Sequence, residues 1–145
     1  MDDEHSQLST AVAALLRDGS RQFILPRFKA LSAEDIATKS SDTDYVTIAD
    51  EEMEAYLTQR LPSVLADTQV LGEEAVSANP ALRAKITDGR VFVVDPVDGT
   101  RNFVQQKSAF CSMVSLLEEG AAVASWIYEP LADICSFAAR HKGCW

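Results

Sequence analysis

Two aspartates stand three residues apart where an apolar run meets a tight turn. Residues 90–94 read Arg-Val-Phe-Val-Val, and they lead directly into Asp95-Pro96-Val97-Asp98-Gly99-Thr100. Magnesium is a hard cation that takes oxygen ligands, commonly a few carboxylates, a backbone carbonyl and waters. Asp95 and Asp98 at a strand end, with the carbonyl of Val97 between them, can therefore bind divalent cations and leave coordination positions for a phosphate.

The residues after the second aspartate suit an anion. Gly99 removes side-chain bulk from the turn and Thr100 can open a short helix, so both backbone amides can point at a phosphate. A plain turn is the alternative, because Asp-Pro and Asp-Gly are ordinary turn dipeptides. Taken alone, the segment favours the plain turn over a metal site.

Acidic residues upstream are weaker candidates. Glu73 and Glu74 follow Val70-Leu71-Gly72 at the end of a short apolar stretch, where a pair of glutamates usually faces solvent. Asp50 stands three residues after Thr47, a spacing typical of a capping box at a helix start. In isolation, capping is the better interpretation of Asp50.

Together these segments resemble a known family. Asp95-Pro96-Val97-Asp98-Gly99-Thr100-Arg101-Asn102-Phe103 is similar to the signature DPIDGTxNF of the inositol monophosphatase family, with Val97 in place of isoleucine. Three other elements occur in that family's order: a D-hydrophobic-VTxxD element after a lysine, a GEE element, and a GxGA(F/W) element. They are matched here by Lys39 with residues 44–50, by residues 72–74, and by residues 142–145.

The resemblance implies a magnesium-dependent phosphatase with two or three Mg²⁺ ions and inhibition by Li⁺. Glu73, Asp95 and the Val97 carbonyl would bind the first ion, while Asp95 and Asp98 would contribute to a second. Activated water would attack the phosphate in line, without a phosphoenzyme.

The resemblance also assigns roles around the metals. Asp50, Glu73 and Thr100 match the catalytic positions that orient the attacking water. Substrate binding falls to Asp98, Gly99 and Thr100, and supporting roles fall to Glu74 and Lys39.

The family pattern continues past the last residue of this chain, with a WDxAAG motif whose aspartate completes the second metal site. Asp133 lies in a hairpin connection and is no replacement. We therefore interpret residues 1–145 as a single N-terminal αβ domain that lacks the C-terminal αβ portion, and expect weak magnesium binding and slow or no turnover.

Inositol monophosphate is the default substrate. Histidinol phosphate, fructose bisphosphate and 3'-phosphoadenosine 5'-phosphate are the alternatives within related families. Residues 104–108 replace the family's more usual turn, which we interpret mainly as loop variation. A catalytically inactive truncated or regulatory module is the alternative from another class.

The fold that must position these residues is mixed α/β (α+β), with helices packed on a largely antiparallel sheet. Apolar spacing predicts a helix from Leu8, broken at Gly19 or Pro26, and a second from near Thr47 that stops at Leu61-Pro62. Glu51, Glu52 and Glu54 are expected to face water. Residues 37–44 and 79–88 are expected to be connections, and strands are expected at residues 70–71, 90–95, 109–117, 121–128 and 134–139.

Bulk composition narrows the function further. A formal net charge of -9 provides no basic stripe, which argues against nucleic acid as the main ligand. The acidic start at residues 1–5 and the lack of a long apolar run argue against a signal peptide or a membrane span. Three cysteines in no metal-binding pattern indicate reduced packing residues, hence the cytoplasm. An uncovered apolar sheet face would make the chain a homo-oligomer.

Overall fold

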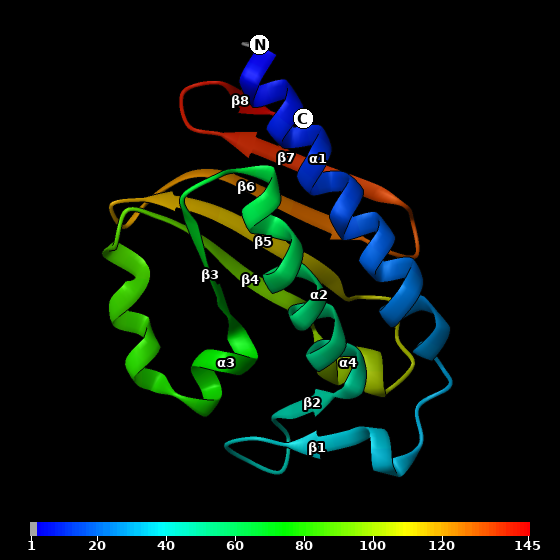
Figure 1. Ribbon diagram of the computed structural model, residues 1–145. Helices are drawn as coiled ribbons and strands as arrows, with labels where there is room; N and C mark the ends of the chain where they lie inside the picture. The colour runs from blue at the N-terminus through cyan, green and yellow to red at the C-terminus, as the bar shows by residue number, and fades with distance from the viewer. Residues whose placement is uncertain (1–2) are drawn as a thin grey trace.

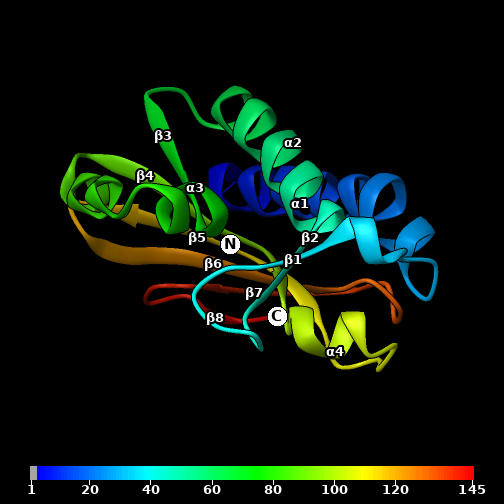
Figure 2. The ribbon, with the colours of Figure 1, turned by 90° about the horizontal axis from the view of Figure 1, so that it is seen from below.

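Helices cover one face of a six-stranded sheet in the computed structural model, which describes residues 3–145 (Figures 1 and 2). Met1 and Asp2, part of the acidic start noted above, lie outside the described residues. The helices are α1 (Asp3–Gly19), α2 (Ile48–Val64), α3 (Glu73–Ala78) and α4 (Thr100–Val104). Irregular helical segments follow α1, precede β1 and follow α3: η1 (Ser20–Ile24), η2 (Leu25–Arg27), η3 (Ala33–Asp35) and η4 (Pro80–Thr87).

The main sheet has the strand order β3-β4-β5-β6-β7-β8. Only β3 and β4 run parallel among these described strands, and every later pair is antiparallel. A mixed α/β fold with a largely antiparallel sheet is thus confirmed. The strands are β3 (Thr68–Gly72), β4 (Arg90–Asp98), β5 (Cys111–Glu118), β6 (Ala121–Glu129), β7 (Ile134–Ala139) and β8 (Gly143–Cys144).

The core lies between the sheet and the pair α1 and α2. Figure 2 shows both helices on one face of the sheet, and η4 contacts β3, β4 and β5. Trp126 is fully buried on β6, its ring lies 5.1 Å from that of Phe137, and its Nε1 donates to the Ser9 carbonyl of α1 at 3.2 Å. Burial of such aromatic surface stabilises the fold.

Three expectations about element bounds are wrong. Residues 37–44 are not all loop, because β1 (Ile36–Thr38) pairs with β2 (Tyr45–Thr47). Residues 79–88 are mostly helical η4 rather than an unstructured connection. Helix α2 runs through Pro62 to Val64, since Leu61 is fully buried and its packing outweighs the hydrogen bond that Pro62 cannot donate.

Strand β4 also continues past the proline at which it was expected to end. Its pairing with β5 shifts register between Asp95 and Asp98, so Pro96 lies in an irregular stretch where no ladder hydrogen bond is needed. The hydroxyl of Ser112 on β5 instead donates a hydrogen bond to the Pro96 carbonyl, with an oxygen–oxygen distance of 2.7 Å. The turn segment is therefore held by the sheet itself.

Within the described part of the chain, no helix is long and apolar enough to cross a membrane. All three cysteines, Cys111, Cys135 and Cys144, are free, as expected, but Cys144 is exposed and is therefore not the packing residue that was predicted.

Candidate active site

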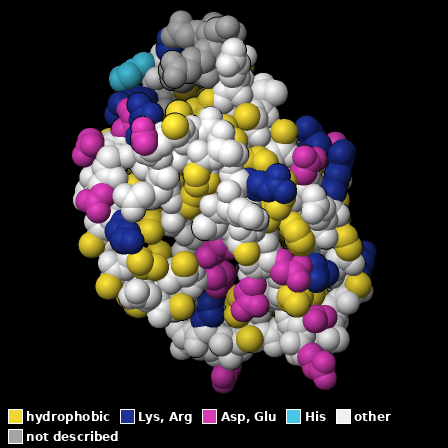
Figure 3. Space-filling model, viewed as in Figure 1, with side chains coloured by type: hydrophobic (Ala, Val, Ile, Leu, Met, Phe, Trp, Pro, Cys, Tyr) yellow, Lys and Arg dark blue, Asp and Glu magenta, His cyan; other side chains and the backbone are white. Residues whose placement is uncertain are grey.

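Parallel pairing of β3 and β4 brings two acidic segments together. Gly72 pairs with Val94, so the next residues, Glu73 and Asp95, emerge side by side at the same edge of the sheet. Glu73 and Glu74 form the first turn of α3, while Asp98 stands at the end of β4. Figure 3 shows acidic side chains gathered between α3 and the start of α2, beside a basic one.

Asp50 reaches the same place from α2 and has both of the roles considered for it. Its Oδ2 accepts hydrogen bonds from the Thr47 amide at 2.9 Å and the Thr47 hydroxyl at 2.6 Å, which completes the capping box. Its Oδ1 accepts from the Thr100 hydroxyl at 3.0 Å. Asp50 is fully buried, and burial raises its pKa against the opposing effect of these bonds. The cap thus also links α2 to the start of α4.

Thr100 opens α4 as expected. Its hydroxyl lies 2.8 Å from the Val97 carbonyl as well as near Asp50. Gly99 precedes it with φ of 83°, and a Cβ there would lie 2.8 Å from the Ala109 carbonyl oxygen. The turn therefore requires glycine both for its left-handed backbone and for space. Phe103, fully buried, anchors α4 against Phe28 and Phe110.

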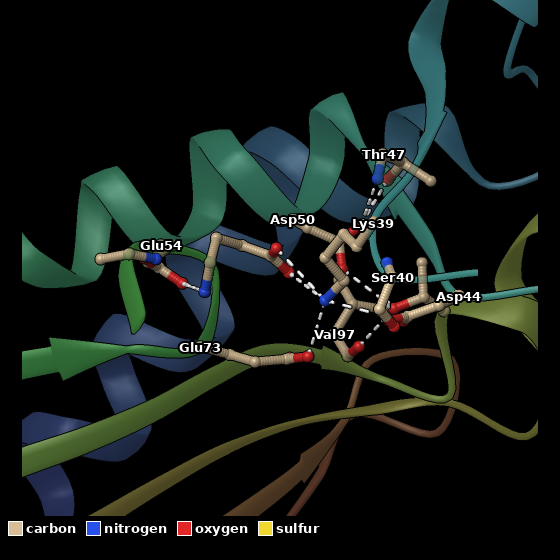
Figure 4. Close-up of polar contacts among 11 residues, drawn as sticks. Lys39, Ser40, Asp44, Thr47, Asp50, Glu54, Glu73 and Val97 are labelled. Carbon is tan, nitrogen blue, oxygen red and sulfur yellow. Dashed lines mark hydrogen bonds and ion pairs between the residues drawn. The ribbon is translucent and has the colours of Figure 1, made fainter. Parts of the chain in front are cut away.

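Lys39 lies at the mouth of the site, in the connection between β1 and β2. Its Nζ is 2.8 Å from Glu73 Oε1 and 3.3 Å from Glu74 Oε2 (Figure 4). Burial alone lowers the pKa of Lys39, but the hydrogen bond and charge of Glu73 outweigh it and the pKa is raised. Burial raises the pKa of Glu74 to about 7, although Lys39 opposes the shift. Lys39 thus forms ion pairs with both glutamates.

Asp95 has the strongest signature of a cation ligand. Its Oδ1 is buried and has no hydrogen-bond partner. Burial raises its pKa, followed by the adjacent Glu73 and then by the charges of Asp98 and Asp50. A buried carboxylate oxygen without a donor is costly. A divalent cation would remove that cost, so the residues present fit magnesium.

A cavity of about 230 Å³ joins these groups. Its lining includes Glu73, Asp95, Val97, Asp98, Gly99 and Thr100, and also Lys39, Thr43, Asp44, Tyr45 and Arg101. We call Asp50, Glu73, Glu74, Asp95 and Asp98 the carboxylate cluster. Among residues 3–145, however, no three Asp, Glu, His or Cys side chains converge tightly enough to form a complete metal-binding group.

Asp133 lies away from this cavity, as expected. It accepts hydrogen bonds from Arg17 at 2.6 Å and from the Tyr128 hydroxyl at 2.8 Å, in the turn between β6 and β7. It joins that turn to α1.

The environment of Glu54 differs from the one predicted from the sequence. It was expected to face water, but it is only 7% exposed and its carboxylate accepts from the amides of Glu74 and Ala75 at 2.7 and 2.9 Å. Glu51 does face water, while Glu52 is half-buried and pairs with Arg27. The spacing in the sequence could have indicated this burial, because Glu54 lies one helical turn after Asp50 and therefore on the same face of the helix.

Comparison with known proteins identifies the family. The profile of the inositol monophosphatase family matches residues 4–145. The chain belongs to this family. Inositol-1-monophosphatase of Bacillus subtilis is 31% identical over 110 residues, 76% of this chain and 40% of that protein. Histidinol-phosphatase of Mycobacterium tuberculosis is 34% identical over 139 residues, 96% of this chain and 50% of that protein.

Solved structures share the fold. Staphylococcal inositol monophosphatase-1, from a crystal soaked in LiCl, superposes with a TM-score of 0.81 at 23% identity, over 100% of this chain and 52% of that one. An IMPase/NADP phosphatase complexed with Mg²⁺ and phosphate gives 0.77 at 23% identity, over 97% of this chain and 50% of that one. The chain spans about half the length of these relatives.

Proposed function

We propose that this chain carries the magnesium and phosphate site of a phosphatase that hydrolyses small phosphate monoesters. The observation that carries the proposal is the cavity in which the unpartnered Asp95 oxygen, Glu73, Asp98 and the Val97 carbonyl meet the Gly99-Thr100 turn. Oxygen ligands of this kind suit two or three Mg²⁺ ions. Bound there, the ions would supply an activated water and charge stabilisation at the leaving oxygen.

The chain's own residues have distinct tasks in this proposal. Glu73, Asp95 and the Val97 carbonyl hold the first cation, and Asp95 with Asp98 contributes to a second. Asp50 accepts a hydrogen bond from Thr100, so the Thr100 hydroxyl is oriented for the attacking water. The amides of Gly99 and Thr100 bind phosphate oxygens, and the neighbouring Asp98 also contacts the substrate.

The comparisons support phosphate monoesters as a substrate class better than they support any one phosphate monoester. Relatives named for inositol phosphate and for histidinol phosphate are 31% and 34% identical to this chain, and a 3'(2'),5'-bisphosphate nucleotidase of Salmonella typhimurium is 30% identical. Such similar values do not separate the substrates. Inositol monophosphate remains the default, and Li⁺ inhibition is expected.

Two wider proposals accompany this one. Residues 1–145 are the N-terminal αβ domain of a longer phosphatase, as the half-length coverage of the relatives supports. Free cysteines favour a cytoplasmic location, and the exposed Ile127, Leu131, Ile134 and Trp145 favour self-association.

A phosphate-release assay tests the function. We expect the 145-residue chain to turn over inositol 1-phosphate slowly or not at all with Mg²⁺, and a chain extended through a relative's WDxAAG segment to turn it over at least about 100-fold faster. Asp95→Asn should abolish both the faster rate and magnesium-dependent phosphate binding, whereas Asp133→Asn should preserve them.

Equal rates for the short and extended chains would contradict the need for the missing aspartate. Phosphate binding that survives Asp95→Asn would contradict the metal site itself. Histidinol phosphate and 3'-phosphoadenosine 5'-phosphate, assayed in parallel, rank the alternative substrates. Magnesium-dependent phosphate binding without turnover of the extended chain would support a binding module instead.

A further inference from the structure

Helix α3 has little to hold it in place. It is six residues long, none of them is buried, and an isolated helix of this length is not stable in water. Its N-cap, Gly72, has no side chain and so cannot cap the first turn. By contrast, α4 on the other side of the cavity is fixed by the buried ring of Phe103. The position of Glu73 therefore depends on another anchor.

Glu54 of α2 provides that anchor. Both of its carboxylate oxygens are used, Oε2 by the Glu74 amide at 2.7 Å and Oε1 by the Ala75 amide at 2.9 Å. These amides belong to the first turn of α3, whose orphan N–H groups a capping side chain would otherwise satisfy. Figure 4 shows the Glu54 carboxyl group directed at backbone nitrogen beside Glu73. Glu54 thus caps α3 from a different helix.

Gly72 makes this arrangement possible. Its φ of -91° is accessible to any residue, so backbone strain does not explain the glycine. Space does, because a Cβ at position 72 would overlap the Glu54 carboxyl group. The glycine at the end of β3 and the buried glutamate on α2 therefore form one unit.

We propose that Glu54 is a positioning residue for the metal site, acting through the first turn of α3 to hold Glu73 beside Asp95. The inference rests on the proposed function, since it assumes that Glu73 and Asp95 bind a cation. The Glu73 side chain is 42% exposed and its carboxylate is held by Lys39 at 2.8 Å, while Glu54 fixes the backbone of the helical turn that carries it.

The arrangement also explains why an extra carboxylate is buried among other acids. Burial raises the pKa of Glu54, and the charges of Glu73 and Asp50 raise it further. Glu54 would be better solvated on the outer face of α2, where Glu51 lies. Two amide donors at a helix start compensate a buried carboxylate. Glutamine offers one oxygen only and cannot accept both bonds in the same geometry.

The test is the affinity of the 145-residue chain for Mn²⁺, used as an oxygen-binding stand-in for Mg²⁺ and followed by electron paramagnetic resonance of the free ion. Glu54→Gln should weaken Mn²⁺ binding by roughly 10- to 100-fold, the effect expected when a group that orients a metal ligand is lost. Glu51→Gln, on the exposed face of the same helix, should leave the affinity within about 2-fold.

A double-mutant cycle identifies the route. Gly72→Ala should also weaken Mn²⁺ binding, because its methyl group displaces the Glu54 carboxylate. Combined with Glu54→Ala it should add little, since the displaced group is already absent. Full additivity of the two losses would overturn the proposal that they form one unit.

Two results separate failure of this inference from failure of the function. A wild-type chain that binds no Mn²⁺ overturns both. A wild-type chain that binds Mn²⁺, with folded Glu54→Gln binding it equally well, overturns only the role of Glu54. If the variants do not fold, hydrogen exchange in the wild-type chain decides: the Glu74 and Ala75 amides should be protected, and exchange at the rate of free peptide would overturn the cap.

Discussion

The apolar layer beneath α1 and α2 and the carboxylate cluster at the end of β3 and β4 differ in how their groups are satisfied. In the apolar layer, the buried polar group of Trp126 has a partner, the Ser9 carbonyl. In the cluster, Asp95 has an unpartnered buried oxygen, and burial raises the pKa of Asp50, Glu74 and Asp95. The apolar layer stabilises the fold, whereas the cluster is unfavourable until a cation binds.

Truncating the apolar layer should have the largest effect on stability. Trp126→Ala removes a fully buried indole and its contact with Phe137, and should lower the free energy of unfolding by about 3–5 kcal/mol. Urea denaturation followed by circular dichroism measures this. Ile127→Ala, on the next residue but 44% exposed, should cost less than about 1 kcal/mol. Similar losses for the two variants would remove the contrast.

The pH dependence of stability should show the opposite character of the cluster. Glu74 has an ordinary pKa of 4.5 and a folded pKa of about 7, so its favourable contribution is full below pH 4.5 and is lost as pH rises through 7. Asp95 and Asp50 are shifted in the same direction. The metal-free chain should therefore lose on the order of 2 kcal/mol between pH 5 and 8.

Urea denaturation with a chelator at both pH values checks this sign. A free energy of unfolding that is constant or rises between pH 5 and 8 would show that the fold does not raise the pKa values of these acids. Mg²⁺ at millimolar concentration should reduce the loss, because a bound cation favours the ionised carboxylates.

A smaller gain in stability should follow from removing one charge of the cluster. Asp95→Asn should raise the free energy of unfolding of the metal-free chain by about 1 kcal/mol at pH 8, since its ionised form is disfavoured by burial and by neighbouring acids. Asp133→Asn is the matched control, because Arg17 and Tyr128 lower the pKa of Asp133. That variant should not be stabilised. A loss of stability in Asp95→Asn would show that the Asp95 carboxylate stabilises the fold, as that of Asp133 does.

Sequence patterns predicted what is local and missed what depends on distant partners. The start of the β4 strand, its glycine turn and the start of α4 were predictable, because residues 90–100 combine a β-branched apolar run with turn chemistry and helix initiation, whereas the continuation of β4 past Pro96 was not. Burial of Glu54 was not predictable from its own helix, because the amides that it caps lie about twenty residues away in sequence. The β1–β2 pairing was missed because three-residue strands carry too little periodicity.

Without the family resemblance, residue types alone indicated the proposed metal ligands but not that they are neighbours. Glu73 and Asp95 are separated by a whole connection, and only the parallel register of β3 and β4 sets their proximity. That pairing is the one departure from the antiparallel pattern among the described strands of the main sheet. Family resemblance supplied the pairing that periodicity could not.

The parallel register also separates the geometry of the site from the length of the chain that connects its two sides. Backbone hydrogen bonds between β3 and β4 align Glu73 with Asp95, so the length of the segment at residues 79–89 does not set their distance, although Pro80, Arg83 and Ile86 line a cavity with both acids. A peptide tag or a fluorescent reporter inserted between η4 and β4 would leave Glu73 and Asp95 aligned. Protein engineers therefore have a permissive position about one strand length from the chemistry.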